Sequence, residues 1–282
     1  TSNANSGVTY TYTGAKTGVW IGPWQTVVIE PSTTTFSRLQ GLKFNSSDIL
    51  HVGNYGGDGA VYRLYTYAGS TWWQNVISGA GSGRDYSSGL DIDGSGQVYS
   101  ANNYIYVNTG HSLDTINYPG QHWYPNDIAV DSKGNLYTTS QGVKKLPYGG
   151  NAWQDISGIM GANSTWGIAT DKWDNVYVAD NSAGKIYVRV NGGNSWQDIS
   201  YGSYFNQVRG IGVDAIGNIY VTENWNNTLK VLPSGGTQWQ TIATSPLLDN
   251  PVGLDFNSQG QLYVANYYNI KYLPAPATKL DW

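Results

Sequence analysis

A short motif that recurs six times constrains the fold of this 282-residue chain more than any other feature. The fifth copy, at 210–221, reads GIGVDAIGNIYV, and the sixth, at 253–264, is closely similar. The earlier copies begin at Gly41, Gly89, Asp127 and Gly167, and the Asn or Asp of each turn follows the previous one by 38 to 48 residues. Repeats of about 40 residues are typical of propellers and solenoids, so we expect a single repeat domain over residues 1–282.

Each copy also predicts its own secondary structure. Two stretches of alternating apolar residues flank an Asn or Asp and a turn glycine, which is the pattern of a short β-hairpin. A third apolar stretch follows, as at 228–232, and then a Gly-Gly turn and a fourth stretch that contains Trp-Gln. We therefore predict an all-β fold, a six-bladed β-propeller with four antiparallel strands per blade.

The Trp-Gln pairs indicate how the ring closes. They begin at Trp73, Trp153, Trp196 and Trp239, and Leu113 stands in the corresponding place of the second unit. The sixth unit ends near residue 274 without such a pair, whereas a spare Trp-Gln-Thr-Val lies at 24–27. We expect the N-terminal strand to complete the last blade, which removes an open sheet edge. A tryptophan present in nearly every unit is expected to serve the scaffold.

The hairpin motif, together with Leu-Pro at 146–147, 232–233 and 273–274, resembles the NHL repeat. The resemblance extends over nearly the whole chain and implies a six-bladed propeller. NHL-like propellers include sensor and adhesion ectodomains, modules that bind RNA or protein, and a few lyases. The resemblance therefore supports the fold and leaves the activity open.

The amino-acid composition limits the classes of partner that this protein could bind. The net charge is -4, which argues against nucleic acid, and no apolar stretch approaches the roughly 18 to 20 residues of a membrane span. Cysteine is absent, charged residues make up 12% and aromatic residues 14%. This composition suits a monomeric protein that is secreted or held at the cell surface.

Alternation along the innermost strands predicts a charged cluster. If one set of side chains packs between blades, the other set faces the central channel. That second set is Lys43, Asp91, Ala129, Ala169, Gly212 and Asp255. Because blades six, one and two are neighbours in a closed ring, we expect Asp255, Lys43 and Asp91 to lie together. An ion pair that lines the channel is the simplest interpretation, and a catalytic lysine or a metal site is the alternative.

Metal chemistry has little support in the sequence. The three histidines, His51, His111 and His122, fall at unrelated positions of their units, so no histidine site is predicted. The turn at Asp93 resembles a calcium loop but lacks the glutamate at loop position 12. No cofactor is predicted, and a bound calcium ion is an alternative that no motif supports. The metal alternative, by analogy with gluconolactonase-like propellers, uses oxygen ligands from Asn102, Asp180, Glu223 and Asn266.

Candidate ligand-binding residues gather in the loops of one propeller face. Planar rings among amides and carboxylates are the chemistry of sugar recognition and of protein hot spots. The candidates are Tyr55, Asn102, Tyr104, Trp123, Trp166, Asp180, Arg209, Glu223, Trp225, Asn266 and Tyr267. We expect an extracellular or cell-surface binding or adhesion module for a glycan or a surface protein, rather than an enzyme. The alternatives are a lyase or lactonase-type hydrolase with an oxygen-ligated metal at the channel mouth, and a sensor ectodomain of a larger surface protein.

Overall fold

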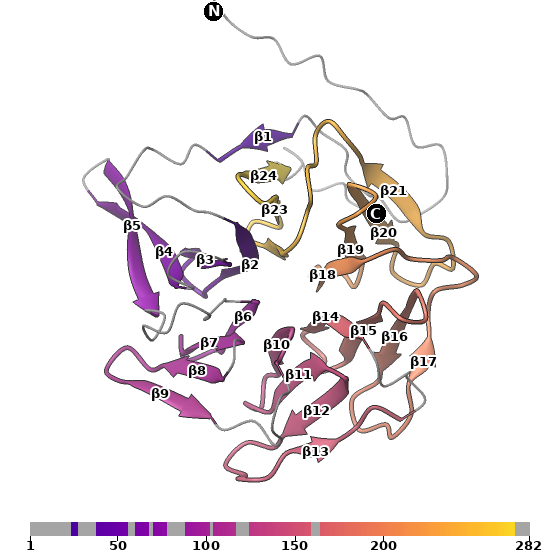
Figure 1. Ribbon diagram of the computed structural model, residues 1–282, viewed down its shortest axis with the longest axis horizontal. Coiled ribbons are helices and arrows are strands. Elements are labelled where there is room, and N and C mark those ends of the chain that lie inside the picture. Colours follow the sequence, from indigo (N-terminus) through magenta and orange to yellow (C-terminus); the bar gives the residue numbers. More distant parts are fainter. Residues whose placement is uncertain are drawn as a thin grey trace, which may run out of the picture.

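Six four-stranded antiparallel sheets form a ring in the computed structural model, which confirms the predicted six-bladed propeller (Figure 1). The structure describes residues 24–27, 38–55, 60–67, 70–77, 88–101, 104–116, 124–158 and 164–273. No helix occurs in these ranges, so they contain no helical segment able to cross a membrane.

The blades follow one another along the chain. Blades 1 to 3 comprise β2 (Leu39–Phe44), β3 (Leu50–Asn54), β4 (Val61–Tyr67), β5 (Ser70–Ile77), β6 (Gly89–Ile92), β7 (Val98–Ala101), β8 (Ile105–Asn108), β9 (Leu113–Ile116), β10 (Asp127–Val130), β11 (Leu136–Ser140), β12 (Gly142–Leu146) and β13 (Gln154–Asp155). Blades 4 and 5 comprise β14 (Thr165–Thr170), β15 (Val176–Asp180), β16 (Lys185–Arg189), β17 (Gln197–Asp198), β18 (Val208–Val213), β19 (Ile219–Glu223), β20 (Thr228–Leu232) and β21 (Gln240–Ala243). Blade 6 comprises β22 (Leu254–Phe256), β23 (Leu262–Ala265), β24 (Ile270–Leu273) and the N-terminal β1 (Gln25–Thr26).

The N-terminal strand closes the ring, as predicted. Figure 1 shows β1 beside β24, and the two strands pair antiparallel, with Gln25 opposite Tyr272. The pairing continues one residue further, because the Val27 N–H donates to the Ile270 carbonyl at 2.9 Å. The first and last described segments of the chain thus share one sheet.

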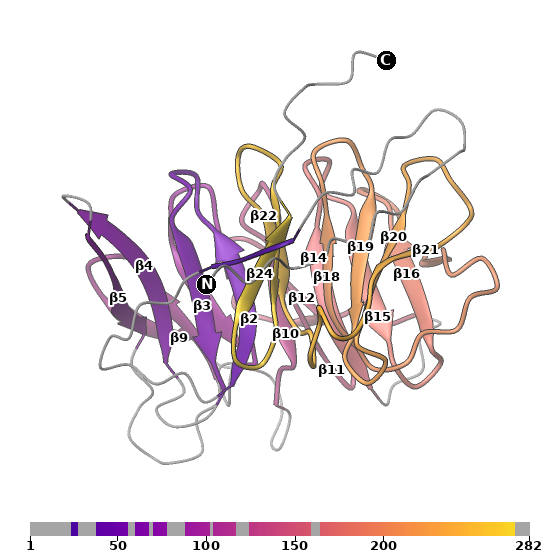
Figure 2. The same cartoon turned by 90° about the horizontal axis from the view of Figure 1, so that it is seen from above.

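The two faces of the ring carry different loops (Figure 2). Because strands alternate in direction, one face bears the loops between second and third strands and the segments that lead into each inner strand. We call this the mouth face. The opposite face bears the tighter turns between first and second and between third and fourth strands, and we call it the turn face.

Apolar side chains pack between blades, and this arrangement corrects the predicted alternation. Ala129 and Ala169 lie in buried apolar clusters instead of facing the channel. A Cβ added at Gly212 would lie 2.4 Å from Leu254 of the next blade, so glycine is needed there for close approach. The physical reason is that a propeller blade turns both sheet faces toward its neighbours, and only the edge of its inner strand borders the channel.

Tryptophans of the Trp-Gln pairs join neighbouring blades. Trp196 is buried and its indole N–H donates to the Ile156 carbonyl of the preceding blade at 2.6 Å. Trp239 repeats the contact one blade later, donating to the Ile199 carbonyl at 2.9 Å. The predicted scaffold role of these residues fits the structure.

The hairpin turns of the motif are held by a second repeated contact. Tyr137 and Tyr177 donate from their hydroxyls to the turn carboxylates of Asp131 and Asp171 at 3.0 and 2.9 Å. His51 occupies the corresponding place in blade 1, where it is buried. Burial lowers the pKa of His51 to about 4, because the uncharged ring loses less on leaving water.

This histidine is expected to make the fold acid-sensitive. Its pKa is lower in the folded chain than in the unfolded one, so the unfolded chain binds the proton first, and stability falls as pH drops from about 6.5 to about 4. The shift corresponds to about 3 kcal/mol. His51→Tyr restores the residue of the other blades and is expected to remove this loss, measured by urea unfolding across that pH range. The matched control, His111→Tyr at an exposed turn, is expected to keep it. An unchanged pH dependence in His51→Tyr would show that the ring is not kept neutral.

Candidate functional site at the channel mouth

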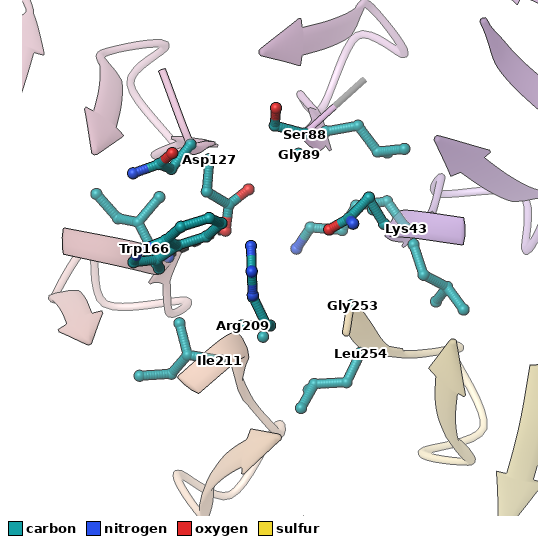
Figure 3. Close-up of a pocket in the computed structure, with 16 residues that line it drawn as sticks. Lys43, Ser88, Gly89, Asp127, Trp166, Arg209, Ile211, Gly253 and Leu254 are labelled. Atoms are coloured by element: carbon teal, nitrogen blue, oxygen red, sulfur yellow. Dashed lines mark hydrogen bonds between the residues drawn. The ribbon is translucent and has the colours of Figure 1, made fainter. Parts of the chain in front are cut away.

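Five blades place a side chain at the centre of the mouth face. Each of these residues directly precedes the first residue of a repeat copy, and together they line one cavity where the inner strands begin (Figure 3). They are Gln40, Ser88, Asn126, Trp166 and Arg209. We call this set the mouth ring.

Local irregularities aim three of these side chains. The inner strands β2, β14 and β18 each have a register shift near their first residues, between Leu39 and Leu42, Thr165 and Ile168, and Val208 and Gly210. A bulge bends a strand and redirects the extra residue. The shifts span Gln40, Trp166 and Arg209 of the mouth ring. Blades 2, 3 and 6 show no such shift in the same pairing.

The cavity that the mouth ring lines at the top of the channel is narrow. Its free space is about 30 Å³, enough for about two water molecules. The inner strands approach so closely that a Cβ at Gly210 would lie 2.1 Å from the Val252 carbonyl oxygen. A ligand larger than water must therefore rest on the mouth ring rather than pass into the channel.

Two arginines stack on aromatic rings at this opening. The Arg209 guanidinium lies 3.4 Å from the ring centroid of Trp166. The Arg38 guanidinium lies 4.4 Å from the ring of Tyr267 and 5.6 Å from that of Tyr55. Backbone bonds hold these loops together, since Tyr55 N–H donates to the Arg38 carbonyl and Leu39 N–H to the Tyr267 carbonyl. Cation–π contacts of this kind orient the cation.

The predicted cluster of Lys43, Asp91 and Asp255 is present. The Lys43 ammonium lies 3.3 Å from Asp91 and 3.6 Å from Asp255. Burial by itself would lower the pKa of Lys43, but the charges of Asp255 and Asp91 outweigh it and raise that pKa. The lysine is therefore a fixed cation and not a base.

The carboxylates of this cluster also link neighbouring blades. Asp255 accepts the Phe44 N–H of blade 1 and Asp91 accepts the Val130 N–H of blade 3, each at 2.8 Å. Asp127 does the same, since its two oxygens accept the N–H groups of Ile128 and Ile168. Burial raises the pKa of Asp127 to about 8. These contacts assign the carboxylates to the scaffold of the ring.

Three predicted ligand-binding residues lie below the surface. Asp180, Glu223 and Asn266 are at most 1% exposed. Asp180 accepts the Ser182 and Ala183 N–H groups of its own loop, and Glu223 lies 2.7 Å from the Lys230 ammonium of its own blade. The prediction that these groups face a ligand does not fit their positions, because each one fastens a loop between second and third strands.

The positions of Asp180, Glu223 and Asn266 also decide whether these residues could bind a metal ion together. The oxygen donors sit in separate blades and are bonded within them, except for Oδ2 of Asp180, which is buried without a hydrogen-bond partner. The ranges that the structure describes contain no group of three His, Asp or Glu able to hold a metal ion. The proposed set of oxygen ligands therefore does not fit a metal centre at the channel mouth. Asn102, the fourth predicted donor, lies outside the described residues.

The other predicted residues divide into two groups. Trp166, Arg209, Tyr55 and Tyr267 meet at the mouth as described above. Tyr104 and Trp225 are exposed at 49% and 67%, in the loops between second and third strands of blades 2 and 5. Trp123 is outside the described residues.

Sequence reasoning missed Gln40, Ser88, Asn126 and Arg38. The first three had a detectable signal, since each stands directly before the first residue of a repeat copy and differs from blade to blade. Arg38 had none, because its contact with Tyr267 joins blade 1 to blade 6 through the closure of the ring.

The chain is similar to known proteins in fold and not in sequence. No protein-family model and no curated protein matches the chain. Among solved structures, virginiamycin B lyase from Staphylococcus aureus is 14% identical over 89% of this chain and 98% of its own, with a TM-score of 0.63. A gluconolactonase from Xanthomonas campestris is 15% identical over 86% and 87%, with a TM-score of 0.67. A chain of a nidogen–laminin complex is 15% identical over 75% and 84%, with a TM-score of 0.62. These likenesses establish the fold alone.

Proposed function

We propose that this protein is a ligand-binding propeller that holds its ligand on the mouth ring. The observation that carries the proposal is the convergence of five side chains from five blades on one opening. They supply amides, a hydroxyl, a guanidinium and an aromatic face. A few polar groups that converge beside an aromatic side chain, here Trp166, are typical of ligand-binding sites.

The proposed ligand is a glycan. Arg209 covers one face of Trp166, so the C–H face of a sugar ring is assigned to the other face of that ring. Gln40, Arg209 and the amide oxygen of Asn126, whose N–H donates to the Thr165 carbonyl, offer hydrogen-bonding groups for hydroxyls. Exposed aromatic residues on the rest of the mouth face would extend the surface. In the described part these are Tyr104, Tyr124, Tyr201, Tyr204, Trp225 and Tyr268, against Tyr148 and Trp173 on the turn face. A surface protein is the other partner to test, and the propeller in the nidogen–laminin complex supports it.

We also propose that the protein acts outside the cell or at its surface. The support is compositional, namely 12% charged residues and 14% aromatic residues. A sensor ectodomain would share this composition and this face.

A lyase or lactonase-type enzyme is the second candidate. The similarity in fold to virginiamycin B lyase and to a gluconolactonase favours it over a purely structural propeller. Such an enzyme would act on a ligand held at the same mouth. Product analysis after incubation with virginiamycin B and with a gluconolactone separates the two candidates, because a binding module returns its ligand unchanged.

The test is a glycan and protein array followed by matched substitutions. Trp166→Ala is expected to weaken binding of the best ligand by about 2 kcal/mol, as for a hot spot. Trp173→Ala, on the turn face, is the matched control and is expected to leave binding unchanged. Loss of binding in Trp173→Ala with none in Trp166→Ala would place the site on the other face.

A further inference from the structure

The mouth carries positive charge that the chain does not neutralise. Within the described ranges, no carboxylate lies within ion-pair distance of Arg38 or Arg209. The Nε atom of Arg209 is buried and has no hydrogen-bond partner there. A buried donor without an acceptor costs free energy, and more so when it is charged. The net charge of the whole chain is -4, so this local excess opposes the overall balance.

The two arginines also act on each other. Burial lowers the pKa of Arg209, and the positive charge of Arg38 lowers it further, whereas Tyr267 and Tyr55 raise it. Arg209 stacks on Trp166, and Arg38 lies over Tyr267 and Tyr55. We call these five residues the arginine cluster. Two like charges held together without a counter-ion are stabilised by an anion that contacts both.

The carboxylates deeper in the channel do not supply that anion. Asp91 and Asp255 contact Lys43 and accept backbone N–H groups of neighbouring blades. Both oxygens of Asp127 accept backbone N–H groups as well. Asp91 and Asp255 are thus engaged by Lys43 and by backbone N–H groups, and burial raises the pKa of Asp127 to about 8, so these three groups leave the arginine cluster without a counter-ion.

A stacked guanidinium keeps its N–H edge available. Carboxylate and sulfate groups accept two parallel N–H bonds from such an edge. The cavity at the mouth has room for about two water molecules, so an anion that contacts the arginines rests outside it, where it can be part of a larger group. Trp166 and Tyr267 are aromatic faces on which a sugar ring can rest.

We propose that the arginine cluster binds an acidic sugar residue, one that carries a carboxylate or sulfate. This inference rests on the proposed function, since it names the ligand class of the same site. The anionic group bridges the guanidinium groups of Arg209 and Arg38, and the sugar ring stacks on the aromatic side chains beside them.

The experiment compares an oligogalacturonate, its carboxyl-reduced neutral counterpart, a sulfated oligosaccharide and inorganic sulfate, by calorimetry and tryptophan fluorescence. We expect an acidic oligosaccharide to bind at least tenfold more tightly than the neutral one, as for a hydrogen bond to a charged group. Arg209→Gln and Arg38→Gln are each expected to weaken that binding at least tenfold and so to remove the preference for the acidic over the neutral oligosaccharide. Raising the salt concentration is expected to weaken the acidic ligand only.

Lys172→Gln is the matched control, because Lys172 stacks on Trp173 at 4.4 Å on the turn face. It is expected to change none of the affinities. Should Arg209→Gln fail to fold, Arg38→Gln decides the result, since Arg38 is only half-buried.

Equal affinity for acidic and neutral oligosaccharides, unaffected by either arginine substitution, would overturn this inference and leave the proposed function standing. Binding of inorganic sulfate as tight as that of the sulfated oligosaccharide would overturn the role of the sugar. If no saccharide binds while Trp166→Ala still weakens binding of a protein ligand, the acidic-sugar inference fails alone. If no ligand of any class responds to Trp166→Ala, both fail.

Discussion

Removal of residues 1–30 is expected to lower the unfolding temperature by roughly 10 to 20 °C, or to leave little soluble protein. The truncation deletes β1 and exposes the backbone groups of β24 that pair with Gln25 and Thr26. It also removes Trp24 and Val27, which pack on the apolar clusters of the last blade and its neighbours. Lost apolar burial and lost hydrogen bonds together amount to about 5 kcal/mol. The exposed edge would invite association between chains.

The matched control is a truncation that removes residues 1–22 and keeps the closing strand. Thermal unfolding and size-exclusion chromatography compare the two proteins at equal concentration. We expect the truncation of residues 1–30 to lose stability and the truncation of residues 1–22 to keep it. A melting curve that is the same for both truncations would show that β1 does not hold the ring closed.

Replacement of Trp196 by alanine is expected to cost about 3 to 5 kcal/mol of unfolding free energy, the range for a buried tryptophan. The side chain is 5% exposed and lies in a cluster with Tyr137 and Val178 of two adjacent blades. Its N–H also satisfies the Ile156 carbonyl, which would lose its partner. Urea unfolding at constant pH measures the change.

Two further variants separate the contributions. Trp196→Phe keeps most of the ring and loses the N–H, so its cost is expected to be about 1 to 3 kcal/mol, that of an unsatisfied carbonyl. Trp225→Ala removes a side chain that is 67% exposed and is expected to change stability by less than about 0.5 kcal/mol. Equal losses in Trp225→Ala and Trp196→Ala would contradict the distinction between scaffold and surface tryptophans.

Much of the architecture was predictable because it follows from sequence patterns within each repeat. The six hairpins, the Asx turns and the missing sixth Trp-Gln pair are each visible within one repeat or by comparison of repeats. The proximity of Asp255, Lys43 and Asp91 also followed from the order of the blades. The reason given for it was incomplete, because these carboxylates accept N–H groups from neighbouring blades as well as contacting Lys43.

The candidate site was predictable only in part. Trp166 and Arg209 were identified because they are aromatic or polar residues of the loops on one propeller face. Asp180 and Glu223 were assigned to the surface because polar loop residues usually lie there, whereas both fasten the backbone of their own blades. Burial of a polar loop side chain depends on the donors that surround it, and a single sequence does not show them.

The sequence alone determined the number of blades and the strand order, since each depends on alternation within about 40 residues. It also indicated the closure of the ring, because the sixth unit lacks a Trp-Gln pair and a spare pair lies at 24–27. Only the tertiary structure decided which side chains share the mouth. Bulges redirect Trp166 and Arg209, and ring closure brings Arg38 of blade 1 against Tyr267 of blade 6. Arg38 and Tyr267 are more than 200 positions apart in the chain, and no local pattern encodes their contact.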